Sequence, residues 1–167
     1  MTDLDDLEQA ILDRINPIPN RAAQEAWTSD RTWTKFLLLA LAEMGHERGF
    51  YVCGSACGEY GQGEWLYDLV WLQNEHSYIK DVPLILESEW SPNLSAVSDD
   101  FMKLLLGRAQ HRVMVFQAPT PKKVSDVIEE LTTQVRNFGP TREGDRYLFL
   151  GFDWAETKRF NPAVFVA

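Results

Sequence analysis

The stretch GEWLYDLVWLQNEHSYIKDVPLILESEW, residues 63–90, decides the fold of this chain. Its first part, residues 64–72, alternates with the period of two that is typical of a β-strand, so that Asp68 and the large aromatic side chains fall on opposite faces. Its last part, Val82–Leu86, is apolar on both faces, which predicts a strand buried inside a sheet. A short polar connector, residues 73–81, is expected to join the two strands.

The buried strand runs directly into two acidic residues, Glu87 and Glu89, which share one face because residues i and i+2 of a strand point the same way. An acidic pair at the end of a buried strand must be hydrated, paired or metal-bound, since an isolated buried charge is costly. If Asp68 faces the same spot, three carboxylates converge on a site for a hard divalent cation. A solvated strand end, with the acids paired to Arg108 or Arg112, is the alternative.

The composition is that of one globular domain. The chain has 167 residues, 45% of them hydrophobic, which is enough for a substantial core and too short to expect two domains. No apolar run approaches the roughly 20 residues of a membrane span, and the acidic N-terminus is unlike a secretory signal, so a cytoplasmic protein is expected. Cys53 and Cys57 are expected to be free thiols, because the three histidines are too scattered to complete a zinc site.

The negative charge is concentrated in the first half of the sequence. The net charge is −9; residues 1–83 hold 6 basic and 14 acidic side chains, and residues 84–167 hold 10 and 11. This balance argues against a protein that coats nucleic acid, which is usually basic. It leaves room for a local contact with nucleic acid through the C-terminal half.

Periodicity and capping residues predict the order of the other elements. They comprise a helix over 3–15, a short helix over 20–27, a helix from Ser29 or Asp30 to about Arg48, a strand over 50–55, a helix from Ser95 or Ser98 to Arg108, a strand over 110–117, a helix over 121–137 capped by Thr120, and strands over 146–152 and 162–166.

This order predicts a single α/β domain with a central mixed sheet flanked by helices. We expect an N-terminal helical extension over 1–28, a core over 29–117, and a C-terminal helix and strands over 118–167.

The helix–strand–strand–strand–helix–strand order resembles the PD-(D/E)XK nuclease superfamily, which has the restriction-endonuclease-like fold. The matching motifs are the Asp of EWLYDLVW, the ESE of LILESEW and the following DDFMKLLLGRAQHRVMVF. The resemblance covers roughly residues 30–117. It implies hydrolysis of phosphodiester bonds in DNA or RNA with the help of Mg²⁺ or Mn²⁺.

Carried over by position, the resemblance makes Asp68 and Glu87 the metal ligands. The family has Lys two residues after the second acid, where this chain has Glu89; some members resemble it in using Glu there as a further ligand or a base. In other members the Lys has moved to the following helix, which makes Lys103 a candidate. An Asp99–Lys103 pair on a solvated helix face is the alternative for that lysine.

A Glu from the first helix of the core is common in the family, and Glu43 or Glu47 could supply it. Two other functions remain open beside a nuclease. One is a nuclease fold without catalysis that serves as a binding or assembly module, and the other is a protein-interaction adaptor that uses its aromatic residues. A homodimer is compatible with all three.

Overall fold

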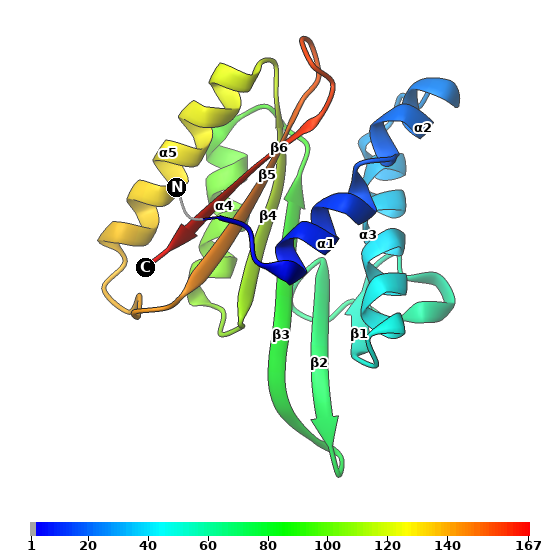
Figure 1. Cartoon of the computed structure of the whole chain (residues 1–167), viewed down its shortest axis with the longest axis vertical. Helices are drawn as coiled ribbons and strands as arrows, with labels where there is room; N and C mark the ends of the chain where they lie inside the picture. Colours follow the sequence, from blue (N-terminus) through cyan, green and yellow to red (C-terminus); the bar gives the residue numbers. More distant parts are fainter. Residues whose placement is uncertain (1–2) are drawn as a thin grey trace.

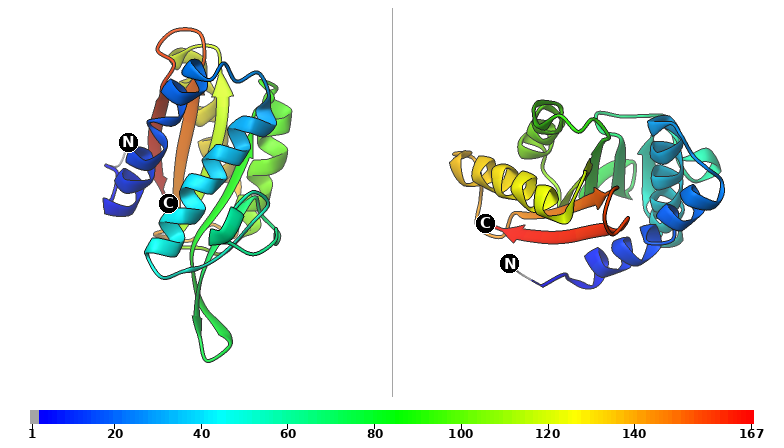
Figure 2. Two further views of the ribbon diagram at one scale, coloured as in Figure 1. Left: turned by 90° about the vertical axis from the view of Figure 1, so that its right-hand side faces the viewer. Right: turned by 90° about the horizontal axis from the view of Figure 1, so that it is seen from above.

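The computed structural model, which describes residues 3–167, is built around one six-stranded sheet with the strand order β1-β2-β3-β4-β5-β6. Helices lie against both faces of the sheet (Figures 1 and 2). This architecture confirms the predicted α/β fold with a central mixed sheet. The elements are α1 (Asp6–Ile15), α2 (Ile18–Gln24), α3 (Asp30–Glu47), β1 (Tyr51–Gly54), the 3₁₀ turn η1 (Gly58–Tyr60), β2 (Leu69–Glu75), β3 (Tyr78–Glu89), α4 (Leu94–Leu106), β4 (His111–Ala118), α5 (Pro121–Asn137), β5 (Arg146–Asp153) and β6 (Phe160–Val166).

The sheet is antiparallel at its edges and parallel at its centre. Strands β1, β2 and β3 form an antiparallel meander, β3, β4 and β5 are parallel, and β6 returns antiparallel to β5. Parallel neighbours require a crossover connection, and α4 and α5 supply the two crossovers. Both crossover helices cover one face of the sheet, and α1 and α3 cover the other (Figure 2).

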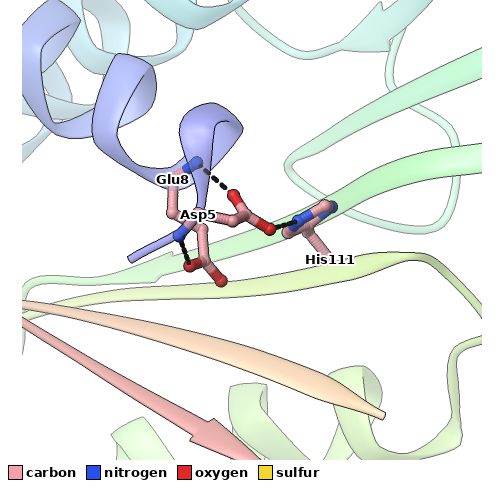
Figure 3. A group of neighbouring side chains, drawn as sticks. All are labelled: Asp5, Glu8 and His111. Atoms are coloured by element: carbon pink, nitrogen blue, oxygen red, sulfur yellow. Dashed lines mark hydrogen bonds and ion pairs between the residues drawn. The ribbon is translucent and has the colours of Figure 1, made fainter. Parts of the chain in front are cut away.

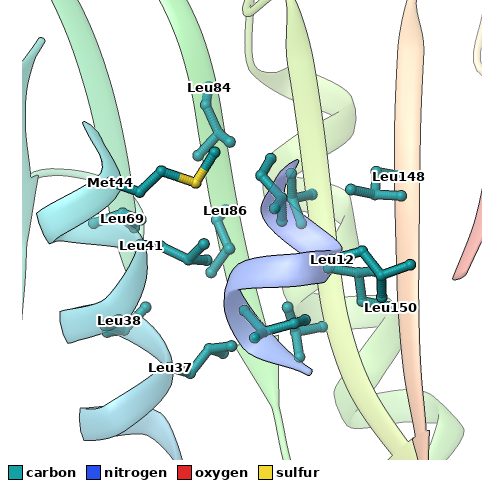
Figure 4. Close-up of a cluster of buried hydrophobic side chains, with 14 of the residues drawn as sticks. Leu12, Leu37, Leu38, Leu41, Met44, Leu69, Leu84, Leu86, Leu148 and Leu150 are labelled. Atoms are coloured by element: carbon teal, nitrogen blue, oxygen red, sulfur yellow. The ribbon is translucent and has the colours of Figure 1, made fainter. Parts of the chain in front are cut away.

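The alternation of β2 divides its side chains between two buried clusters, as its sequence predicts. Leu69 and Trp71 pack toward α3, whereas Val70 and Leu72 pack toward α4 and α5. Figure 4 shows the first cluster, in which side chains of α3 and α1 meet those of the strands. Its labelled members are Leu12, Leu37, Leu38, Leu41, Met44, Leu69, Leu84, Leu86, Leu148 and Leu150.

Hydroxyl and amide side chains start the long helices. Ser29 accepts a hydrogen bond from the Thr32 N–H at the start of α3, and Thr120 caps α5 in the same manner, which confirms both predicted caps. Helix α4 begins earlier than predicted, because Asn93 rather than a serine caps it. Helix α2 also begins earlier than predicted, since its proline lies in the first turn, where no N–H is needed.

The predicted polar connector between β2 and β3 is wrong. Residues 73–81 continue both strands into a long hairpin that projects from the body of the protein (Figure 1). Its turn consists of His76 and Ser77, both with positive φ (49° and 70°), a geometry that matches the twist of two paired strands. The predicted start of the first strand is also wrong: residues 64–68 lie outside β2, and Leu66 has a φ of 67°.

Candidate functional site

Asp68 and Glu87 come together through the register of β2 and β3. Leu69 pairs with Leu86 in the antiparallel ladder, so the next positions outward are Asp68 and Glu87. Glu87 lies on the sheet face covered by α4, where its carboxylate meets Lys103. The structure therefore brings together three of the four side chains that the sequence suggests for catalysis.

The carboxyl group of Glu87 is buried and only half satisfied. The residue is 1% exposed, and its Oε2 accepts a hydrogen bond from Lys103 Nζ at 3.1 Å. Its Oε1 has no hydrogen-bond partner among residues 3–167. Buried polar atoms in folded proteins nearly always have a partner, so an unpartnered oxygen indicates a position that a ligand, an ion or water would fill.

The environment of Glu87 favours its neutral form. Burial, followed by the nearby charge of Asp68, raises the pKa of Glu87 from 4.5 to about 8, even though Lys103 acts to lower it. Two neighbouring carboxylates repel each other when too little positive charge lies near them. A bound divalent cation would remove this repulsion.

Lys103 points from α4 to Glu87 and forms a second ion pair within its own helix, with Asp100 at 2.7 Å. The expected alternative pair with Asp99 is not formed. Burial acts to lower the pKa of Lys103, but its hydrogen bonds to Asp100 and Glu87 outweigh burial and hold the pKa above its ordinary value. Lys103 therefore remains charged beside Glu87 throughout the physiological pH range.

Asp68 is held in place by the residue that follows Glu87. Its Oδ2 accepts hydrogen bonds from both the N–H and the hydroxyl of Ser88, each at 2.8 Å. These bonds come from the polar residue between the two glutamates of the ESE motif. They fix the orientation of the Asp68 carboxylate next to Glu87.

The other acidic candidates do not complete a three-ligand cluster with this pair among the described residues. Glu89 accepts a hydrogen bond from the Ser91 N–H at 2.6 Å, and it does not join Asp68 and Glu87 in a three-ligand cluster within the described chain. The expectation for the first core helix needs correction. Glu43 and Glu47 form ion pairs with Arg14 of α1, on the face of the sheet opposite α4. Because α3 covers the face of the sheet opposite Glu87, neither glutamate joins the site.

Tyr67 is a neighbour of the site that sequence reasoning missed. Burial raises the pKa of Tyr67, the charge of Glu87 raises it further, and Arg112 lowers it, so the phenol lies between opposite charges. A Cβ at Gly107 would lie 2.5 Å from the Tyr67 hydroxyl, so any larger residue at this end of α4 would have to displace the Tyr67 side chain. The only sign of Tyr67 in the sequence was its position as a large aromatic residue directly before Asp68.

A second group of acidic and imidazole side chains lies on the opposite face of the sheet, where Asp5, the N-cap of α1, and Glu8 of α1 meet His111 of β4 (Figure 3). His111 Nε2 is 2.8 Å from Asp5 Oδ2. Asp5 and Glu8 also cap α1 reciprocally, each accepting the other's backbone N–H at 2.9 Å. Burial acts to raise the pKa of Asp5, but the hydrogen bonds from His111 and the Glu8 N–H hold it below its ordinary value.

Arg146 already provides the positive charge of this second group. Its guanidinium donates to both carboxylate oxygens of Glu8, each at 2.7 Å, and it lies 3.2 Å from Asp5. A cation placed here would have to displace that guanidinium. The group is therefore a clamp that fastens α1 to the sheet, and the Asp68–Glu87 pair remains the better candidate for a functional site.

Comparisons with family models, with curated proteins and with solved structures gave no match. Among the described residues, no helix is both long enough and apolar enough to cross a membrane. We therefore infer the function from the chemistry of the site itself.

Proposed function

We propose that this protein is a Mg²⁺-dependent nuclease that hydrolyses phosphodiester bonds at the Asp68–Glu87 site. One observation carries the proposal: a buried carboxylate with an unpartnered oxygen lies next to a second, oriented carboxylate and a lysine. The observed order α3-β1-β2-β3-α4-β4 supports it, because it is the helix–strand–strand–strand–helix–strand order on which the resemblance to the PD-(D/E)XK superfamily is based.

The residues present fit a small hard cation. Asp68 and Glu87 would hold it through carboxylate oxygens, the ligands that Mg²⁺ prefers, and Mn²⁺ would be accepted by the same donors. A bound ion of this kind would polarise a phosphodiester and lower the pKa of a water molecule. Glu87 would lose its proton on binding, since its pKa of about 8 keeps it largely neutral at pH 7.

Lys103 and Glu89 have separate roles in the proposal. Lys103 is half-exposed and charged, so it can contact a phosphate oxygen and offset the negative charge that develops there. It would replace the lysine that the family motif places at the position of Glu89. Glu89 has one oxygen bonded to the Ser91 N–H, and its other oxygen would accept a proton from the attacking water.

A nuclease assay with Mg²⁺ or Mn²⁺ tests the proposal on plasmid DNA, single-stranded DNA and RNA. Wild-type protein is expected to cleave at least one of them, and Asp68→Asn and Glu87→Gln are expected to reduce the rate roughly a hundredfold or more. Glu129→Gln, at an exposed position of α5, is the matched control and is expected to cleave like the wild type. Equal rates for the wild type and both site variants would contradict the proposal.

A second candidate is a binding module that keeps the nuclease fold without catalysis. The observation in its favour is a set of exposed apolar side chains on the loop before β2 and on α4, the segments that flank Glu87: Trp65, Leu66, Met102 and Leu106. Such side chains are typical of protein contacts. Titration with Mn²⁺ separates the two candidates. A nuclease is expected to bind Mn²⁺ and to lose this binding in Glu87→Gln, whereas the binding module is expected to show no such Glu87-dependent binding.

We place this activity in the cytoplasm, with nucleic acid bound only locally. Cys53 and Cys57 are both buried and free, which suits a reducing compartment. Burial raises the pKa of Cys57 to about 11, so this thiol is unreactive at neutral pH.

A further inference from the structure

A cavity of about 190 Å³ lies at the C-terminal end of α4, beside the loop between α5 and β5. Arg108, Arg112 and Arg142 line it, together with a single acidic residue, Asp145. The protein has a net charge of −9, so three arginines around one small cavity are a local exception to its acidic character. An excess of fixed positive charge in a concave site favours an anionic ligand.

Arg112 is the buried member of the group. It is 4% exposed, its Nε donates to the Gly107 carbonyl at 3.0 Å, and its Nη2 donates to Asp145 Oδ1 at 3.1 Å. The ring of Tyr147 lies beside the guanidinium, with 5.1 Å between the Arg112 Cζ and the centroid of the ring. These contacts fix the orientation of the Arg112 guanidinium. They leave its Nη1 buried without a hydrogen-bond partner among residues 3–167. A guanidinium stays charged, so a buried and unused donor on it favours an acceptor from outside the chain.

Asp145 cannot neutralise the whole group. One of its oxygens accepts from Arg112 and the other accepts from the backbone N–H of Arg142 at 2.9 Å. It therefore orients Arg112 and shapes the loop that carries Arg142. Within the described chain, the side chains of Arg108 and Arg142 form no ion pair, so both are available to a ligand in the cavity.

We propose that this cavity is a phosphate-binding pocket. A tetrahedral phosphate group offers several oxygens to donors that converge on it, and arginine binds phosphate through two parallel hydrogen bonds. Arg112 supplies a rigid, buried contact, and Arg108 and Arg142, which line the same cavity without ion pairs, supply two more. The phosphate comes either as the free ion or as a phosphate on a nucleic acid. The pocket rests on its own residues and does not depend on a metal at Asp68 and Glu87.

Calorimetric titration in the presence of EDTA, at constant ionic strength, tests the pocket without any contribution from a metal site. The probes are inorganic phosphate, a 5′-phosphorylated dinucleotide and the same dinucleotide without the 5′-phosphate. Wild-type protein is expected to bind at least one phosphate-bearing probe. Preference for the phosphorylated dinucleotide identifies a nucleic acid end as the source, and binding of inorganic phosphate alone identifies the free ion.

Variants decide whether the named arginines are responsible. Arg108→Gln and Arg142→Gln remove side chains that have no ion pair to lose, so both proteins are expected to fold, and each is expected to bind at least tenfold more weakly. Arg159→Gln removes the same charge at an exposed position before β6 and is expected to bind as the wild type does. The proposal is overturned if the wild type binds no probe at millimolar concentration, or if Arg159→Gln weakens binding as much as the two pocket variants.

Discussion

Two buried glutamates on opposite faces of the same sheet have opposite surroundings. Glu8 is 0% exposed, and both its oxygens accept hydrogen bonds from Arg146. Glu87 is 1% exposed, but one of its oxygens has no partner in the described chain, and a second carboxylate lies beside it. Burial alone therefore does not mark a functional acid. The distinguishing feature is whether the chain itself satisfies the charge that it buries.

The largest expected loss of stability comes from breaking the satisfied pair. Glu8→Gln leaves the mostly buried guanidinium of Arg146 without its main partner, and we expect a loss of roughly 3 kcal/mol in the free energy of unfolding. Urea denaturation at pH 7 measures the loss. Glu143→Gln, at an exposed position in the loop before β5, is the control and should change stability by less than about 0.5 kcal/mol. An unchanged midpoint for Glu8→Gln would show that the clamp on α1 contributes little.

The same substitution at the unsatisfied glutamate is expected to act in the opposite direction. Folded Glu87 keeps its proton up to about pH 8, whereas the unfolded chain releases it near 4.5, so the folded state binds more protons between these values. Glu87 therefore lowers the free energy of unfolding of the metal-free protein as pH rises through this window. Above the window the loss is constant. The shift limits this loss to about 5 kcal/mol, at about 1.36 kcal/mol per pKa unit.

Glu87→Gln carries no proton to lose and is expected to remove this dependence. The variant should resemble the wild type near pH 5 and exceed it by a few kcal/mol at pH 9, as measured by urea denaturation of both proteins across the pH range without metal. A difference between the two proteins that does not change with pH would contradict the raised pKa of Glu87.

A smaller shift is expected when the neighbouring carboxylate is neutralised. Asp68→Asn removes a charge that raises the pKa of Glu87, while its amide oxygen can still accept the two hydrogen bonds from Ser88. The upper end of the pH window should move down by roughly one unit. Asp99→Asn, at an exposed position of α4, should leave the window in place.

Lys103 is expected to have the smallest effect on stability. Its side chain is 49% exposed, so solvent screens its pair with Glu87, and Lys103→Gln should change the free energy of unfolding by less than about 1 kcal/mol at pH 7. Because Lys103 lowers the pKa of Glu87, its loss should move the upper end of the window upward. Lys122→Gln, on the exposed start of α5, is the control.

The sequence predicted the buried parts of the fold better than the exposed ones. The period-two pattern before the connector and the continuous apolar run after it identified the inner ends of β2 and β3, because these residues pack on both faces of the sheet. The hairpin beyond them was not predicted. Residues 73–81 pair in solvent, so their sequence has no hydrophobic pattern that would indicate a strand. Because of the positive φ at Leu66, β2 likewise begins later, at Leu69, than the alternation suggested.

The candidate site was predictable only in part, for a related reason. Spacing along β3 placed Glu87 at the end of a buried strand, and the strand register then brought Asp68 beside it. Spacing along α4 could not decide between Asp99 and the sheet as the partner of Lys103, because helical periodicity does not tell what lies opposite a helix. The pairing of Glu8 with Arg146 joins residues 138 positions apart, and no local pattern connects them.

The most direct test of the central claim is calorimetric titration of the protein with Mn²⁺ at pH 7, in buffers of different ionisation enthalpy. We expect binding with release of close to one proton per ion, because the ion displaces the proton of Glu87, and we expect Glu87→Gln to abolish this binding. Failure of the wild type to bind Mn²⁺, or binding that persists in Glu87→Gln, would contradict the claim that the unsatisfied glutamate is a metal ligand.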